Sequence, residues 1–289
     1  MWREELKELA ETIRSHPQFP LANRRFATDF VAWRGGLGVL NKVLSNLARE
    51  HIFEHALYLH FARDPGDLDD GATFERLAAL SESRDEIGAR AVRTGLHLAQ
   101  IAGLFILRRS RSDARQRIYE PTEPLIAMTR EYSALAFQVL DDIAPNLNLS
   151  ARIRHEHSLT PALLARMGEI YLNSEFRRHR DSDRLTNLMR LDGGRAVLAA
   201  VVDCHWRQIP LPTAQEFARL FYVSPSQIRA ILKSAELHGL VRGASRGLII
   251  DAEPLANAYL DAQARYLAFS MRYGLGLDRA ALATKIAAV

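Results

Sequence analysis

The sequence predicts a mainly α-helical fold with small β-wings, and three observations support this prediction. Apolar residues recur every three or four positions through most of the 289 residues, which is the period of helices packed on a core. Two segments, 73–122 and 213–251, each contain two short helical patterns followed by a hairpin pattern. The order of these patterns repeats along the chain. The predicted fold class is therefore tandem winged helix-turn-helix domains joined by a helical, dimer-like core.

The segment 213–251 gives the clearest pattern. Its second helix is predicted to begin at Ser224, which with Gln227 forms a capping-box pattern, and Pro225 falls at the first helical position. An apolar stripe then faces the core, a glycine ends the helix, and two short strands follow. The first helix carries Phe217 and Phe221, the stripe is Ile228, Ile231, Leu232 and Ala235, the glycine is Gly239, and the strands are 240–242 and 248–250.

The earlier segment, 73–122, has the same order of parts. Four more residues separate Leu77 from Gly103 than separate Phe217 from Gly239. The turn or the start of the second helix is therefore expected to differ between the two segments. Two candidate caps for that helix stay open, Ser83 with Glu86 or Ser81. The wing of this segment is longer, with its strands predicted at 104–109 and 115–119.

The repeat extends upstream of the hairpins. The stretch 34–43 (RGGLGVLNKV) resembles 192–201 (DGGRAVLAAV), and each copy closes with a long helical pattern. The predicted divisions are an N-terminal helix at 1–23, a first copy at 24–144 with its winged helix at 55–122, a connection at 145–161, and a second copy at 162–289 with its winged helix at 195–252.

Composition predicts a soluble, cytoplasmic protein with an anionic partner. The chain is 48% hydrophobic and 25% charged, and it shows neither a long apolar run nor a secretory pattern. Cys204 lies in an apolar helical pattern and is expected to be a core residue. The net charge is +4, but residues 84–119 sum to +5 and residues 224–246 to +3. Positive charge is therefore concentrated in the two winged-helix segments, as DNA binding requires.

Enzyme and cofactor patterns are missing from the sequence. His51 with His55, and His155 with His157, are spaced so that each pair could share a metal ion, but no third ligand accompanies either pair. These histidines are therefore expected to be surface or packed residues. The sequence contains no phosphate-binding glycine loop, nucleophile elbow or zinc signature. We therefore predict no enzymatic activity, no metal and no cofactor.

The first wing, ILRRSRSDARQRIYEPT, resembles the wing of the MarR-type bacterial transcription regulators, which carry an Asp-x-Arg pair at the hairpin. That pair is here Asp113 and Arg115. The resemblance implies that Arg115 reaches the minor groove or its phosphates while Asp113 holds the guanidinium. The second wing lacks the pair. Family members are usually homodimers with one wing per chain, whereas this sequence carries two, which predicts a monomeric covalent pseudo-dimer or a homodimer.

The expected function is sequence-specific binding of double-stranded DNA by a transcriptional regulator, in the first instance a repressor. A plasmid-type replication initiator or a non-enzymatic protein-interaction module built from tandem winged helices is the alternative. The candidate DNA contacts are Arg84, Arg90, Arg93, Arg108, Arg109, Arg111, Asp113, Arg115, Arg117, Ser224, Ser226, Gln227, Arg229, Lys233, Arg242, Ser245 and Arg246. The resemblance also implies a small aromatic effector, for which the candidate residues are Trp33, Tyr58, Phe61 and Trp206.

Overall fold

The computed structural model describes residues 2–64, 66–67, 69–113, 115–173, 184–243 and 251–287. Within these ranges the chain is mainly helical and contains one two-stranded antiparallel sheet. The mainly α prediction is therefore confirmed. The second strand of the second wing, predicted at 248–250, lies outside the described residues, as do Ser245 and Arg246.

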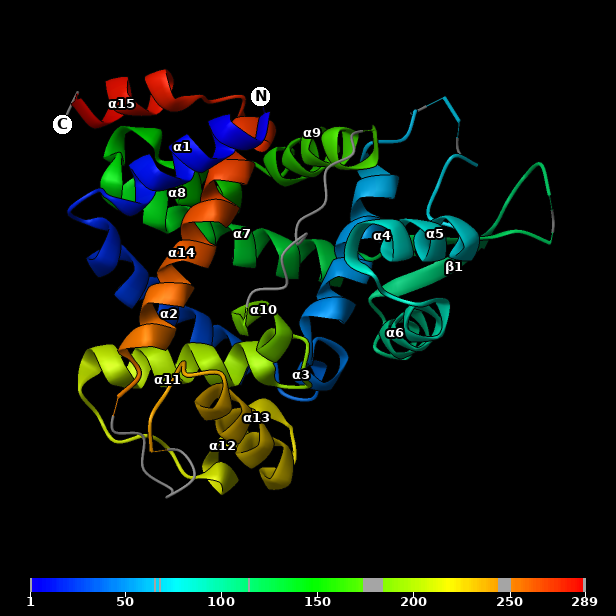
Figure 1. The fold of residues 1–289 in the computed structure, drawn as a ribbon. Helices are drawn as coiled ribbons and strands as arrows, with labels where there is room; N and C mark the ends of the chain where they lie inside the picture. Colours follow the sequence, from blue (N-terminus) through cyan, green and yellow to red (C-terminus); the bar gives the residue numbers. More distant parts are fainter. Residues whose placement is uncertain are drawn as a thin grey trace.

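The first half of the chain runs from α1 to α7 and contains both strands of the sheet (Figure 1). Its helices begin where capping side chains or prolines satisfy the first N–H groups, as Asn46 and Thr73 do for the Arg49 and Arg76 N–H groups. The elements are α1 (Trp2–Arg14), α2 (Phe19–Gly36), α3 (Leu40–Val43), α4 (Leu47–Phe61), α5 (Phe74–Asp85), α6 (Ala89–Ile101), β1 (Phe105–Arg109), β2 (Arg117–Pro121) and α7 (Glu123–Ile143).

The second half has the same order of helices. A 3₁₀ turn, η1 (Pro145–Leu147), leads into it, and a π-helical turn, η3 (Ser270–Leu275), extends its long helix α14. The elements are α8 (Leu149–His155), α9 (Leu159–Asn173), α10 (Arg184–Met189), α11 (Gly194–Arg207), α12 (Ala214–Phe221), α13 (Pro225–Leu237), α14 (Glu253–Phe269) and α15 (Arg279–Ala287).

The hairpin of the first half is antiparallel, with Phe105 opposite Pro121 and Arg109 opposite Arg117. A further bridge joins Thr73, just before α5, to Ile118, so the hairpin is tied to the start of the helix pair. In the second half the corresponding described contact is an isolated antiparallel bridge between Arg242 and Asp251.

The leading helices of each half pack against helices of the other half. Helix α2 packs on α11, and α9 packs on α4; likewise α1 packs on α14, and α8 packs on α7. The N-termini of α4 and α11 also meet, because the Ser45 Oγ and the Asn46 Nδ2 each donate to Asp192 at 2.6 Å. In Figure 1 the α5–α6 pair lies at the right and the α12–α13 pair at the bottom, with α7 and α14 towards the middle.

Two hydrophobic cores support this arrangement. The larger one joins α2, α7, α11 and α14 with the second helix pair, and the smaller one joins α4, α9 and the first helix pair. Cys204 is buried, as expected. Because the leading helices cross between halves, each helix pair rests on elements contributed by both halves of the sequence.

Three local expectations were wrong. The four extra residues of the first segment lie in its first helix, since α5 has 12 residues and α12 has 8, whereas α6 and α13 both have 13. Neither proposed serine caps α6, which begins after Gly88 without a capping side chain. The Gly-Gly echo is not structurally equivalent, because Gly35–Gly36 ends α2 whereas Gly193–Gly194 begins α11.

Candidate nucleic-acid interface and pocket

The two helix pairs turn in the same way. Glu86 ends α5 in the left-handed region at φ 57°, and Tyr222 ends α12 there at φ 58°. The N-caps of α6 and α13 lie two residues later, and that of α13 is Ser224, whose hydroxyl accepts the Gln227 N–H at 3.2 Å. The predicted cap at Ser224 is therefore confirmed, and the turn holds both helix pairs in the same local geometry.

Both second helices also end alike. Gly103 and Gly239 adopt φ +71° and +70°, a conformation that glycine reaches without strain. The next residue folds back in each case, with Leu104 N–H donating to the Ala99 carbonyl at 2.8 Å and Leu240 N–H to the Ala235 carbonyl at 2.9 Å. These matched ends turn the chain out of each second helix, in the first half into the β1–β2 hairpin and in the second half toward the bridge between Arg242 and Asp251.

Helix α6 presents one exposed face. Val92, Leu96 and Ala99 are buried on the other side of the helix. Arg93 lies with its guanidinium 4.7 Å from the centre of the Phe74 ring, a cation–π contact that fixes its direction. The exposed face consists of Arg90, Arg93, Thr94, His97 and Ile101, with Ala89 and Ala91 also exposed in the first turn, and only the two arginines were predicted from the sequence.

Helix α13 presents the matching face. Counted from the two helix starts, each exposed residue of α13 has an exposed counterpart in α6, and these residues are Ser226, Arg229, Ala230, Lys233 and Leu237. Gln227 is half-buried beside this face. Ile101 and Leu237, at the equivalent last positions, are 72% and 78% exposed. The shared helical period would have identified Thr94 and His97 once the helix starts were known.

The first wing carries most of the predicted arginines on its surface. Arg109, Arg111, Arg115 and Arg117 are exposed. Arg108 is engaged instead, because its Nε donates to Glu120 at 2.7 Å and this hydrogen bond raises the pKa of its guanidinium.

Three further candidate residues, Asp113, Arg84 and Arg242, have partners within the protein. Asp113 accepts the backbone N–H of Arg115 at 2.8 Å, so it shapes the turn, whereas the resemblance implied that it holds the guanidinium. Arg84 donates to the Leu172 carbonyl of α9 at 3.2 Å and is part of the helix packing. In the second half Arg242 is exposed and pairs with Asp251 at 2.7 Å.

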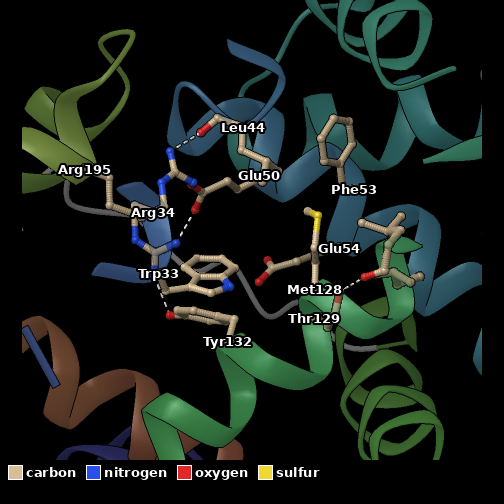
Figure 2. Close-up of a pocket in the computed structure, with 12 residues that line it drawn as sticks. Trp33, Arg34, Leu44, Glu50, Phe53, Glu54, Met128, Thr129, Tyr132 and Arg195 are labelled. Atoms are coloured by element: carbon tan, nitrogen blue, oxygen red, sulfur yellow. Dashed lines mark hydrogen bonds and ion pairs between the residues drawn. The ribbon is translucent and has the colours of Figure 1, made fainter. Parts of the chain in front are cut away.

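A pocket lies beside the first helix pair, between α2, α4 and α7 (Figure 2). Its volume is ≈ 80 Å³. A cavity of roughly 150 Å³ holds benzene, so an aromatic ligand would need the lining side chains to move. The lining residues are Trp33, Arg34, Leu44, Glu50, Phe53, Glu54, Leu57, Leu125, Met128, Thr129, Tyr132 and Arg195.

Buried charges form one wall of this pocket. The Glu50 carboxylate accepts from Arg34 at 3.2 Å and from Arg195, which also donates to the Tyr132 hydroxyl. Burial lowers the pKa of Arg34. Burial also acts to lower the pKa of Arg195, but the nearby Glu50 carboxylate outweighs it and the pKa is raised. The Glu54 carboxylate points toward the Trp33 indole from the opposite side (Figure 2). The pocket lining therefore has two cations and two anions, a balanced set that sequence spacing does not reveal.

The four predicted effector residues are not brought together. Trp33 lines the pocket. Tyr58 is buried with its ring 5.4 Å from that of Tyr171, and the Trp206 ring lies 6.2 Å from that of Tyr259. Phe61 contacts the His60 ring at 4.8 Å.

His51 and His55 are packed residues, as expected. Both contact the buried Asp85 carboxylate, at 3.1 and 2.9 Å, and the Tyr171 hydroxyl donates to the same carboxylate at 2.7 Å. His55 also hydrogen-bonds Ser81 at 3.0 Å. This polar cluster ties α4 and α5 to α9, the leading helix of the other half.

Comparisons with protein-family models, curated proteins and solved structures find no match for this chain. In the described part of the chain, three or more His, Cys, Asp or Glu side chains nowhere converge as a metal site. Among those same residues, every helix is too short or too polar to span a membrane.

Proposed function

We propose that the protein is a sequence-specific, DNA-binding transcriptional regulator that uses two non-identical winged helices as a covalent pseudo-dimer. The observation that carries the proposal is the pair of matched, exposed helix faces on α6 and α13, each following a helix and a tight turn, with α6 leading into the β1–β2 hairpin and α13 followed by the Arg242–Asp251 bridge. A second helix in this setting is the element that enters the major groove in helix-turn-helix proteins.

The chemistry of the faces suits this role. Arg93 and Arg229 occupy equivalent positions near the start of each helix, where side chains reach base edges or phosphates. Other equivalent positions differ: the second residue of α6 is Arg90, whereas the second residue of α13 is Ser226. Because the faces differ, the two half-sites need not be identical, and the bound site is expected to be non-palindromic.

The first wing supports the proposal through its exposed arginines and its resemblance to the MarR-type wing. Arg111 and Arg115 flank the tip, and neither points into a core. Cations at a hairpin tip reach the phosphates or the narrow minor groove beside the helix. Bound over a promoter, such a protein acts as a repressor by occupying the DNA.

We extend the proposal to a small effector at the pocket around Trp33 and Arg195. The pocket is shared by α4, which supports the first helix pair, and by α2 and α7 of the central helices. A ligand that favours one arrangement of these helices shifts the population of DNA-competent molecules. A thermal-shift screen with small aromatic acids tests this extension, and the absence of any stabilising compound would count against it.

The test of DNA recognition is selection from a pool of random duplexes with the full chain, followed by footprinting and titration across salt concentrations. We expect one enriched sequence with two unlike half-sites about 10 base pairs apart. Arg115→Ala should lower the salt slope by about one unit on selected and random duplexes alike. Equal affinity for selected and random DNA would rule out a specific regulator, and a perfect inverted repeat would rule out non-identical reading.

A further inference from the structure

The acidic loop before the first helix pair contacts the first wing. Asp69 in this loop is only partly exposed, although its neighbours Asp64 and Asp67 are exposed. Its carboxylate accepts the backbone N–H of Arg111 at 2.9 Å and that of Ser112 at 2.8 Å. The loop therefore reaches more than 40 residues along the sequence to the turn of the hairpin.

The wing turn offers these N–H groups because of its own internal bonds. Ser110 N–H donates to the Gln116 carbonyl at 3.1 Å and closes the turn, and the Ser110 hydroxyl accepts the Ser112 and Asp113 N–H groups at 3.2 and 3.1 Å. Successive N–H groups in a turn form a concave site for an anion, and the Asp69 carboxylate occupies that site.

Arg108 strengthens the same contact from the strand. Its guanidinium lies 3.5 Å from the Asp69 carboxylate and also binds Glu120. The Arg111 N–H, followed by the Ser112 groups, holds the pKa of Asp69 well below its usual range. Asp69 therefore keeps its charge, and its hydrogen bonds to the turn, through the ordinary pH range.

We propose that Asp69 is a positioning residue of the first wing: by binding the turn's N–H groups it fixes the direction in which Arg111 and the tip arginines meet DNA. This inference rests on the proposed DNA-binding function. The second half has no counterpart, because its link between α11 and α12 is Gln208–Thr213 (QIPLPT), which contains no acidic residue. The positioning contact is therefore a feature of the first wing.

The sign of the effect separates this role from simple electrostatics. Removal of a carboxylate beside cationic side chains makes the surface more positive, and by charge alone it would strengthen binding to DNA. Loss of the positioning contact frees the turn, so ordering the tip on DNA costs entropy and binding weakens. Asp69→Ala should thus weaken binding even though it removes a negative charge.

The experiment compares three full-length variants by fluorescence anisotropy on a mixed-sequence duplex and on the selected site. Asp69→Ala should raise Kd about tenfold, as for one lost charge-assisted hydrogen-bond pair. Asp69→Asn keeps one accepting oxygen and should recover part of the affinity. Asp64→Ala removes the same charge from the same loop but only a local bond to the Gly66 N–H, so it should leave Kd unchanged or lower it.

Hydrogen exchange of the Arg111 and Ser112 amides gives a readout independent of DNA. Both amides should lose protection in Asp69→Ala and keep it in Asp64→Ala. Unchanged protection in Asp69→Ala would overturn the inference, as would tighter DNA binding by that variant. If the wild-type chain failed to bind duplex DNA while the amides responded as expected, the proposed function would fail and the contact between Asp69 and the turn would stand.

Discussion

The two halves of the molecule share a backbone plan but fill it with different interiors. Helix α4 in the first half and α11 in the second both support a helix pair, and their N-termini meet between the halves. The buried face of α4 includes two histidines with two half-buried glutamates beside it, whereas the buried residues of α11 are mainly alanine, valine and leucine, with Asp203 and Cys204 near its end. The shared backbone plan is what the fold requires, and the polar interior is what the first half adds to it.

Matched positions show the difference most clearly. His51 and His55 are the fifth and ninth residues after the N-cap Asn46. The fifth and ninth residues after the N-cap Gly193 are Leu198 and Val202, which are fully buried. The last residues of α5 and α12, which lie just before the left-handed turn, are Asp85 and Phe221.

The pocket residues show the same difference, with charged side chains in α4 where α11 has apolar ones. Glu50 and Glu54 are the fourth and eighth residues after the Asn46 cap, where α11 has Val197 and Val201. An apolar interior forms without partners, but each buried polar group needs one. The second half is therefore built as a fixed support, while the first half depends on a set of hydrogen bonds and charges that a ligand or a substitution can alter.

The largest effects should come from breaking each interior at its matched position. Phe221→Ala removes a ring stacked on Phe217 and should destabilise the fold by about 3–5 kcal/mol through the cavity it leaves. Asp85→Ala should destabilise by a similar amount for another reason, since His51, His55 and Tyr171 lose the carboxylate they share. Denaturant unfolding of the full chain measures both.

A combined variant sharpens this prediction by changing the first interior to the second type. His51→Leu, His55→Val, Asp85→Leu and Tyr171→Phe together should unfold at a denaturant concentration much closer to wild type than Asp85→Ala does, because apolar replacements need no partners. If the combined variant were less stable than Asp85→Ala, the polar cluster would be required by the backbone plan and the comparison would be wrong.

The pocket charges should give the next largest effect. Glu50→Gln leaves Arg34, which is 2% exposed, and Arg195 without their shared carboxylate. We expect a loss of about 3 kcal/mol, the range for a buried ion pair broken on one side. Val197→Ala at the matched position of α11 should cost only about 1–2 kcal/mol as a small cavity. Equal losses of unfolding free energy would show that the charged side chain of α4 and the apolar side chain of α11 contribute equally to stability.

His60 in the first half should make the stability depend on pH. Burial, and then the charge of Arg63, lowers the pKa of His60 to about 4 from its ordinary 6.5. The unfolded chain therefore binds more protons between these values, so the stability present above pH 6.5 is lost as pH falls toward 4. His60→Gln should flatten this part of the stability curve, measured by urea unfolding.

The helices could be predicted from sequence, and the interiors could not. The period of Ile228, Ile231 and Ala235 and the cap at Ser224 define α13, because both signals are local. The polar cluster requires Tyr171 from a helix that crosses over from the other half. That crossing is a property of the tertiary fold, and no local spacing records it.

The same limit applies to the candidate site. Arg90 and Arg93 were recognisable as cations on a helix. Asp69, by contrast, is one of several acidic residues in a loop whose sequence predicts only solvent exposure. Its contact with the wing depends on the hairpin folding back over this loop. Arg195 directly follows Gly193–Gly194. The repeated Gly-Gly pair aligned the start of α11 with the end of α2, so nothing in the sequence indicated that Arg195 lines the pocket.

The smallest expected effect concerns base reading by the second half. Gln227 lies in the first turn of α13, and a glutamine in that place can pair bidentately with adenine. Gln227→Ala should cost on the order of 1–3 kcal/mol at one base position, toward the lower end because the side chain is half-buried, and should leave the salt slope unchanged. Ala91→Gln, at the equivalent position of α6, is the matched addition and should change preference only in the other half-site. Competition titrations with single-base variants of the selected duplex measure both changes. If Gln227→Ala weakened binding to every variant equally, as Arg115→Ala should, then α13 would contact phosphates alone, and reading of bases would have to be assigned to α6.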